Sequence, residues 1–184
     1  VLARFPEVLT AEKRESDREA VLQGMLEILG QSLVEYDVMR AREGQRLRED
    51  VELRLQEIER LVAVVEARSP QTVEEYRQKL LVRMEDVLQN RELDPQRILL
   101  EAALFADKTA VSEETVRLHS HIAQMRTMLE EGSPAGRKLD FLVQEFNREA
   151  NTIGSKCNDG ELAKVVVDLK AEIEKIREQI QNIE

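Results

Sequence analysis

The sequence is poor in aromatic residues and in cysteine. Its 184 residues include no tryptophan, two tyrosines, four phenylalanines and one cysteine. A single cysteine, Cys157, excludes a disulfide within the chain and any zinc site built from several thiolates, and it suits a reducing compartment. No apolar run approaches the roughly 18 residues of a membrane-spanning helix, and no signal-peptide pattern opens the chain. We therefore expect a soluble, cytoplasmic protein without membrane contacts.

What the sequence does contain is typical of long helices. Hydrophobic residues make up 42% and charged residues 35% of the chain, with leucine, valine, alanine, glutamate, lysine and arginine dominant. This mixture is more typical of helical bundles and coiled coils than of β-sandwiches. The composition predicts an all-α fold with enough apolar residues for a real core.

The charge balance argues against a general nucleic-acid binder. The net charge is −10, whereas binding to phosphates normally depends on clustered lysine and arginine. The segment 133–164 differs from this average, because five basic residues there balance five acidic ones. It is locally neutral in an otherwise acidic chain.

Helix-start signals divide the chain into seven expected helices. Ser69–Pro70, Asp94–Pro95 and Ser133–Pro134 each place a capping side chain before a proline at the first helical position. Capping patterns at Ser16, Ser112 and Asn158 mark further starts. The expected helices are 17–43, 45–68, 70–90, 95–107, 113–131, 134–153 and 159–183. Gly44 either kinks the first two or lies within one long helix.

Two of these helices have an apolar seam whose residues recur at alternating gaps of four and three, the heptad pattern of a helix packed on another helix. The seams are Val51, Leu55, Ile58, Val62 and Val65 in one helix, and Leu162, Val166, Leu169, Ile173, Ile176, Ile180 and Ile183 in the last. We expect a multi-helix array with long antiparallel hairpins. Residues 1–92 would form a helical hairpin or arm, and residues 93–184 a helical catalytic domain.

A first polar group lies on the helix expected at 113–131. Glu114, Arg117 and His121 are spaced i, i+3 and i+7 and therefore share one face. His119 and His121 point in different directions, so this helix does not readily offer both to one metal ion. The structural alternative is an exposed ion pair beside an ordinary surface histidine.

A second polar group lies on the helix expected at 134–153. Glu145 and Glu149 are spaced i, i+4, so together they can hold a divalent cation, and Arg148 between them can contact a phosphate. The alternative is a ladder of exposed salt bridges. In the following turn, we expect Gly154 to stop the helix in a left-handed conformation. The segment Gly154–Lys156 lacks the earlier glycine of a Walker motif.

The stretch GRKLDFLVQEFNREANTIGSK at residues 136–156, followed by IREQIQNIE at 176–184, resembles the carboxy-terminal signature of the YicC/YloC-like endoribonucleases. The segments 42–44 and 101–121 are also similar to this family. Family members have a β-containing amino-terminal region before the point where this chain starts, at Val1, so the resemblance indicates a fragment. Two positions depart from the family pattern: Ala110 replaces a usual acidic residue, and Cys157 replaces a usual serine.

The resemblance implies a bacterial, metal-dependent enzyme that cuts single-stranded RNA internally as a ring-like hexamer. The family pattern falls on polar residues already noted and on a few others: Glu101, Glu114, His121, Gln144, Glu145, Arg148, Glu149, Asn151, Thr152, Ser155 and Lys156. We expect Glu101, Glu114, Glu145 and Glu149 to hold Mn²⁺ or Mg²⁺, with His121, Glu145, Arg148 and Glu149 catalytic. RNA contacts are expected from Arg117, Arg148, Asn151, Ser155 and Lys156.

Two other functions agree with the same sequence. One is a non-catalytic oligomeric adaptor that binds RNA and delivers it to another nuclease, with RNA-decay proteins as partners. The other is a purely structural coiled-coil scaffold. Metal-dependent cleavage of RNA by purified protein separates the enzyme from both alternatives, and RNA binding without cleavage selects the adaptor.

Overall fold

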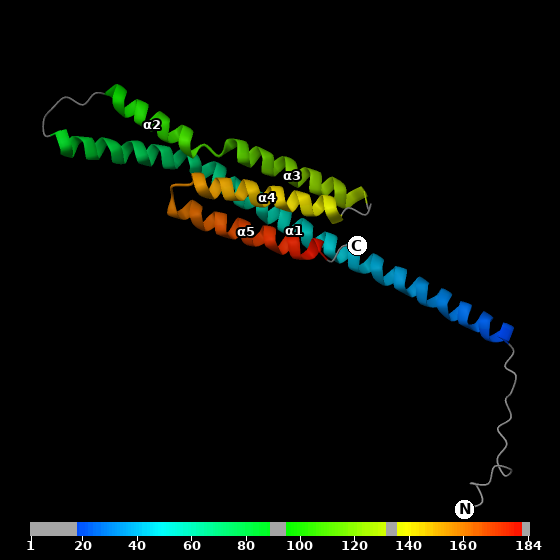
Figure 1. Cartoon of the computed structure of the whole chain (residues 1–184). Coiled ribbons are helices and arrows are strands. Elements are labelled where there is room, and N and C mark those ends of the chain that lie inside the picture. Colours follow the sequence, from blue (N-terminus) through cyan, green and yellow to red (C-terminus); the bar gives the residue numbers. More distant parts are fainter. Residues whose placement is uncertain (1–17, 89–94, 132–135, 182–184) are drawn as a thin grey trace, which may run out of the picture. The chain divides into compact units, whose positions relative to one another are not determined.

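The structure is a computed structural model that describes residues 18–88, 95–131 and 136–181. Within these ranges every element is a helix: α1 (Arg18–Leu88), α2 (Pro95–Thr109), α3 (Ser112–Glu131), α4 (Gly136–Lys156) and α5 (Gly160–Ile180) (Figure 1). The predicted all-α class is confirmed. None of the described helices combines the length and apolar character that crossing a membrane requires.

Helix α1 spans the region where helices were expected at 17–43, 45–68 and 70–90, and it confirms the alternative in which Gly44 lies within one long helix. It continues through Gly44 and through Pro70, so the predicted helix start at Ser69–Pro70 is wrong. A proline inside a helix removes one backbone hydrogen bond and costs about 3 kcal/mol. Nearby contacts offset this cost: the Thr72 hydroxyl donates to the Ser69 carbonyl at 2.8 Å, and Arg68 pairs with Asp159 of the α4–α5 turn at 2.7 Å.

The chain forms two compact units, Val1–Gly44 and Gln45–Glu184. In the first unit the described residues, from Arg18 onward, belong to α1, and most of their large apolar side chains are exposed. The second unit contains the rest of α1 and helices α2 to α5. The functional division between residues 92 and 93 stays a prediction.

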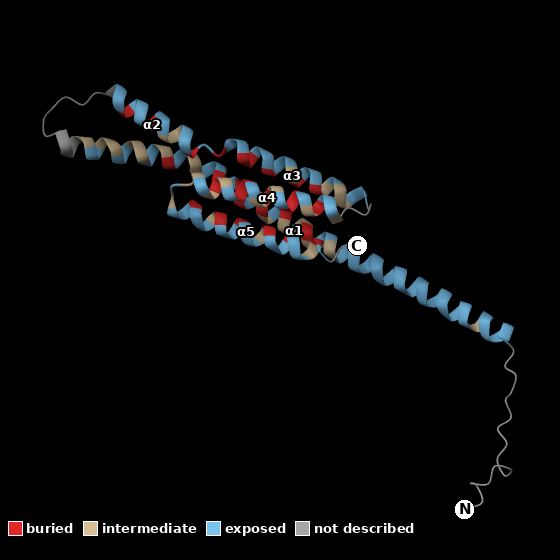
Figure 2. Cartoon of the chain, viewed as in Figure 1, coloured by how far each residue is buried: buried red, intermediate tan, exposed pale blue. Residues whose placement is uncertain are grey.

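The core of the second unit is built from α1, α3, α4 and α5, whose buried faces appear in Figure 2. All five predicted seam residues of α1 are buried, as are six of the seven in α5; the seventh, Ile183, lies outside the described residues. Helices α3 and α4 contribute Leu118, Ile122, Met125, Leu139, Leu142, Val143, Phe146, Ala150 and Ile153. Burying each large apolar side chain contributes about 1.5–3 kcal/mol, so this shared core holds α3 and α4 in place.

Ion pairs between helices set how α1 lies against α3 and α5. Arg126 of α3 binds Glu52 at 2.9 Å and Glu59 at 2.7 Å, two residues that are two helical turns apart on α1. Arg54 of α1 contacts Glu172 of α5 at 3.3 Å. Because each contact joins residues far apart in sequence, together they fix the lengthwise position of α3 and α5 on α1.

The turn between α4 and α5 differs from the expected one. Gly154 lies inside α4, which continues to Lys156, so it does not stop the helix. A Cβ atom at this position would lie 3.1 Å from Val166 Cγ1, and the glycine therefore lets α4 and α5 approach closely. Asp159, rather than Asn158, caps α5, because its side chain accepts a hydrogen bond from the Glu161 N–H.

Candidate functional site

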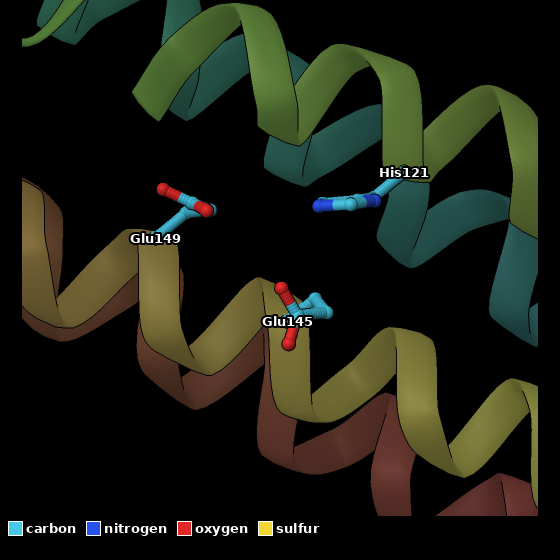
Figure 3. Close-up of side chains that lie close together, drawn as sticks. All are labelled: His121, Glu145 and Glu149. Carbon is cyan, nitrogen blue, oxygen red and sulfur yellow. The ribbon is translucent and has the colours of Figure 1, made fainter. Parts of the chain in front are cut away.

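The facing surfaces of α3 and α4 bring three candidate ligands together. His121 comes from α3, and Glu145 and Glu149 come from adjacent turns of α4. Each offers one ligand atom such that all three atoms lie within 4.8 Å of one another. Figure 3 shows the three side chains pointing toward one another. Two positions spaced i, i+4 on α4 and one on α3 thus form a group that could hold a metal ion.

The imidazole of His121 is in an unusual environment. Both of its ring nitrogens are buried and have no hydrogen-bond partner among the described residues. Leaving a buried polar atom unpaired costs about 1–3 kcal/mol, so such a group in a native protein calls for an explanation such as a bound ion, a bound water or a catalytic role. Glu149 is also buried, with 4% of its side chain exposed, whereas Glu145 is 22% exposed. One imidazole and two carboxylates are a donor set that fits a divalent cation such as Mn²⁺.

Arg117 connects this group to a third carboxylate, that of Glu114. Its Nε donates to Glu149 Oε1 at 2.8 Å, and its Nη2 donates to Glu114 Oε1 at 3.1 Å. The hydrogen bond to Glu149 raises the pKa of Arg117 above its ordinary value. Glu149 is therefore held by a permanently charged guanidinium, which fixes the orientation of its carboxylate.

Glu114 was expected to bind metal, but it lies outside the three-residue group. It is buried, and its Oε1 accepts hydrogen bonds from Lys156 at 3.0 Å and from Arg117. Its Oε2 is buried without a partner among the described residues. Burial alone would raise its pKa, but the Lys156 hydrogen bond and the charges of Lys156 and Arg117 outweigh burial, so the pKa is lowered.

The remaining residues that were predicted to bind RNA or metal lie outside the group formed by His121, Glu145 and Glu149. Arg148 is 73% exposed and lies 3.5 Å from Glu145. Asn151 and Ser155 are exposed on α4, and the Ser155 hydroxyl donates to the Thr152 carbonyl at 2.9 Å. Glu101 is exposed on α2 and is not part of the group formed by His121, Glu145 and Glu149. Its role as a metal ligand stays a prediction.

The two departures from the family pattern lie just beyond helix ends. Ala110 is in the short connection between α2 and α3, where its N–H donates to the Asp107 carbonyl at 3.3 Å. The Cys157 thiol donates to the Gly154 carbonyl at 3.1 Å. Burial raises the pKa of this thiol, which makes it a poor nucleophile.

Replacing Lys156 with methionine is expected to lower the stability of the metal-free protein by about 1–2 kcal/mol at pH 7, since it removes a charge-assisted bond to the buried Glu114. The pKa of Glu114 lies below its ordinary 4.5, so the stability that its charge contributes is present above that pH. This stability is lost as the pH falls through the lowered pKa. Lys156→Met should raise the pKa of Glu114 and shift this loss of stability to higher pH.

Urea unfolding in EDTA at several pH values measures this effect. The difference between the wild type and Lys156→Met should be largest near pH 7 and should shrink as Glu114 becomes protonated. Lys170→Met, which changes an exposed lysine of α5, serves as the control and should show little difference at any pH. An equal loss of stability across the whole pH range would contradict the assigned pairing.

Sequence reasoning missed a group of polar residues on the other side of α4. A cavity of about 650 Å³ is lined there by Asn147, Arg177 and Gln181, together with residues already named. The recurrence of Gln144, Asn147 and Asn151 on one face of α4 could have predicted a polar surface there. The sequence could not predict that residues of α5 join this group, because that depends on how far α5 is shifted along α4.

Comparisons with known proteins show which family this chain resembles. A family model described as "Endoribonuclease YicC-like, C-terminal" matches residues 65–184. The chain is 40% identical over 184 residues to a protein of Clostridioides difficile (strain 630) named "Probable endoribonuclease YicC", which covers 100% of this chain and 63% of the relative. A Haemophilus influenzae protein (strain ATCC 51907 / DSM 11121 / KW20 / Rd) of the same name is 39% identical over 181 residues, which is 98% of this chain and 62% of the relative.

The chain thus spans less than two thirds of the length of these relatives. The family model nevertheless covers more than half of the chain, including α3, α4 and α5, which carry the site. The chain therefore belongs to the YicC-like endoribonuclease family.

Proposed function

We propose that this chain carries the catalytic site of a metal-dependent endoribonuclease that cleaves single-stranded RNA internally. The observation that supports the proposal most is the group formed by His121, Glu145 and Glu149, in which both imidazole nitrogens are buried without a partner among the residues that the structure describes. The relatives named as probable endoribonucleases supply the reaction class. Mn²⁺ is favoured over Mg²⁺, because a nitrogen ligand suits Mn²⁺ better.

The three residues would hold the cation through one imidazole nitrogen and two carboxylate oxygens. When bound, a divalent cation neutralises the scissile phosphate and makes an attacking oxygen more nucleophilic. Glu149 contributes the most rigid ligand, because it is buried and held by Arg117. Glu145, which is partly exposed, lies on the side from which RNA would approach.

Arg148 is the residue best placed to contact the phosphate. Its side chain is largely exposed, and its only contact among the described residues is a long one, at 3.5 Å, with Glu145. It can therefore turn toward a bound strand at little cost and balance the negative charge of the phosphate. Lys156 and Arg117 are already bound to carboxylates, so we assign them first to positioning Glu114 and Glu149 and only then to RNA.

We further propose that the protein acts in the cytoplasm as a homo-oligomer, with a hexamer as the expected form. Within residues 21–39, eleven large apolar side chains are exposed, including Leu22, Leu26, Leu29 and Leu33. Monomeric proteins rarely leave so many apolar residues uncovered on one segment. Copies of the same chain could cover them.

Cleavage of an end-labelled single-stranded RNA by the intact, highly purified protein tests the proposal. We expect internal cleavage with Mn²⁺, no cleavage with EDTA, and recovery when Mn²⁺ is added back. Mg²⁺ at the same concentration should support a lower rate. RNA binding without cleavage under every metal condition would overturn the enzyme and favour the adaptor that delivers RNA to another nuclease.

A further inference from the structure

The cavity between α4 and α5 is not explained by the proposed catalytic group. Its volume of about 650 Å³ lies within the range of about 300–1,000 Å³ typical of small-molecule sites. Its polar lining includes Gln144, Asn147, Arg148, Asn151, Arg177 and Gln181. Val143 also borders the cavity but is fully buried behind this polar lining.

Amide side chains dominate the lining, and this selects the kind of ligand. An asparagine or glutamine amide offers both donors and acceptors, as the edge of a nucleobase does, and it can pair with adenine through two hydrogen bonds. Among the described residues, the side chains of Asn147 and Asn151 have no hydrogen-bond partner, while the Gln144 amide donates to Asp140 at 2.9 Å. The cavity therefore has free hydrogen-bonding groups for a base.

The charges around the cavity agree with a nucleotide rather than with a metal ion or a cluster of phosphates. Among the described residues that line it, Asp140 is the single carboxylate, too few for a cation site. Its two arginines are Arg148 and Arg177, and the latter contacts Glu174 at 3.4 Å. Two guanidinium groups suit one nucleotide, because a planar guanidinium can stack on a base or pair with a phosphate.

Arg148 links the cavity to the candidate catalytic group. It lines the cavity and also lies 3.5 Å from Glu145. The exposed surface of α4 therefore runs from the acidic group facing α3, across Arg148, to the amides facing α5. A strand with its scissile phosphate at Glu145 would place a neighbouring nucleotide at the cavity.

We propose that the α4–α5 cavity is a subsite that binds one base of single-stranded RNA beside the cleaved phosphate. This inference rests on the proposed endoribonuclease function and adds a site of base recognition to it. Asn147 and Gln181 contact the base edge, and Arg148 holds the adjoining phosphate. Single-stranded RNA suits this arrangement because its unpaired bases can turn outward into a cavity.

Equilibrium binding measured without metal tests the subsite. The intact protein is titrated in EDTA with two fluorescein-labelled twelve-nucleotide strands, one of adenosines and one with the same ribose-phosphate backbone but no bases. The wild type should bind the adenosine strand about tenfold more tightly, the discrimination expected of one well-paired base. The double variant Asn147→Ala with Gln181→Ala should lose this difference while still binding the strand without bases.

The matched control is Gln56→Ala with Gln124→Ala, which removes two exposed amides outside the cavity and should keep the tenfold preference. Equal binding of the two strands by the wild type, or an unchanged preference in the Asn147 and Gln181 variant, would overturn the subsite. Because the proposed reaction needs a metal ion, no cleavage is expected in EDTA, and this result is separate from the cleavage assay. A protein that binds the adenosine strand more tightly than the strand without bases, but never cuts RNA in the cleavage assay, would refute the catalytic proposal and leave the base subsite standing.

Discussion

Replacing Glu145 and Glu149 together with glutamine is expected to reduce kcat/KM for RNA cleavage by at least about 100-fold, to near the detection limit. Glutamine keeps the shape of each side chain but loses the negative charge that binds a cation and supports its chemistry. The two residues come from adjacent turns of α4, and with His121 they place three ligand atoms within 4.8 Å. The measurement is the initial rate of cleavage of a labelled RNA across a Mn²⁺ titration.

A fold defect must be separated from a chemical defect in this experiment. Glu149 accepts a 2.8 Å bond from Arg117, so Glu149→Gln also weakens a buried ion pair. Glu145→Gln alone avoids this problem, because Glu145 is partly exposed and its only ion pair within the described ranges is a long one with Arg148. We expect the single variant to retain wild-type helicity and oligomeric state and still to lose most cleavage activity.

The matched control changes another pair of glutamates at the same i, i+4 spacing. Glu174 and Glu178 lie exposed on α5, outside the candidate metal group. Glu174→Gln with Glu178→Gln changes the net charge equally and should cleave RNA at close to the wild-type rate. Cleavage by the Glu145 and Glu149 double variant at that same rate would show that these carboxylates are not the catalytic ligands.

Replacing His121 with leucine is expected to act in opposite directions on stability with and without metal. Leucine removes two buried nitrogens that have no partner in the described part of the chain, so the metal-free protein should become more stable by about 1–2 kcal/mol. The wild type should gain about 2.7 kcal/mol at a Mn²⁺ concentration 100 times its Kd. The variant should gain almost nothing at that concentration, because one of the three ligands is gone.

Thermal unfolding in EDTA and in Mn²⁺ measures both effects, and His119→Leu is the control on the same helix. His119 is exposed and lies 3.4 Å from Glu66, so its replacement should leave the Mn²⁺-induced rise in Tm unchanged. A similar rise in the His121→Leu protein would exclude His121 as a ligand. No other role of this imidazole predicts a more stable metal-free protein that stops responding to Mn²⁺.

The periodic parts of the sequence predicted the fold well. The seam residues from Val51 to Val65 and from Leu162 to Ile180 are buried as their spacing indicates, because helical periodicity decides which face can join a core. The local stop signals were less reliable. Pro70 and Gly154 both lie inside helices, since contacts with residues distant in sequence outweighed the local tendency to end a helix.

The sequence by itself determined the helices, their apolar faces and the grouping of polar residues along α3 and α4. It also placed Glu145 and Glu149 on one helix face, because residues at i and i+4 are neighbours in any α-helix. Only the tertiary structure decided that His121 joins these two glutamates while Glu114 instead binds Lys156 and Arg117. Helical spacing fixes distances within a helix, but the distance between residues on different helices depends on their packing. The core side chains set that packing, and the interhelical ion pairs set how far each helix is shifted along its neighbour.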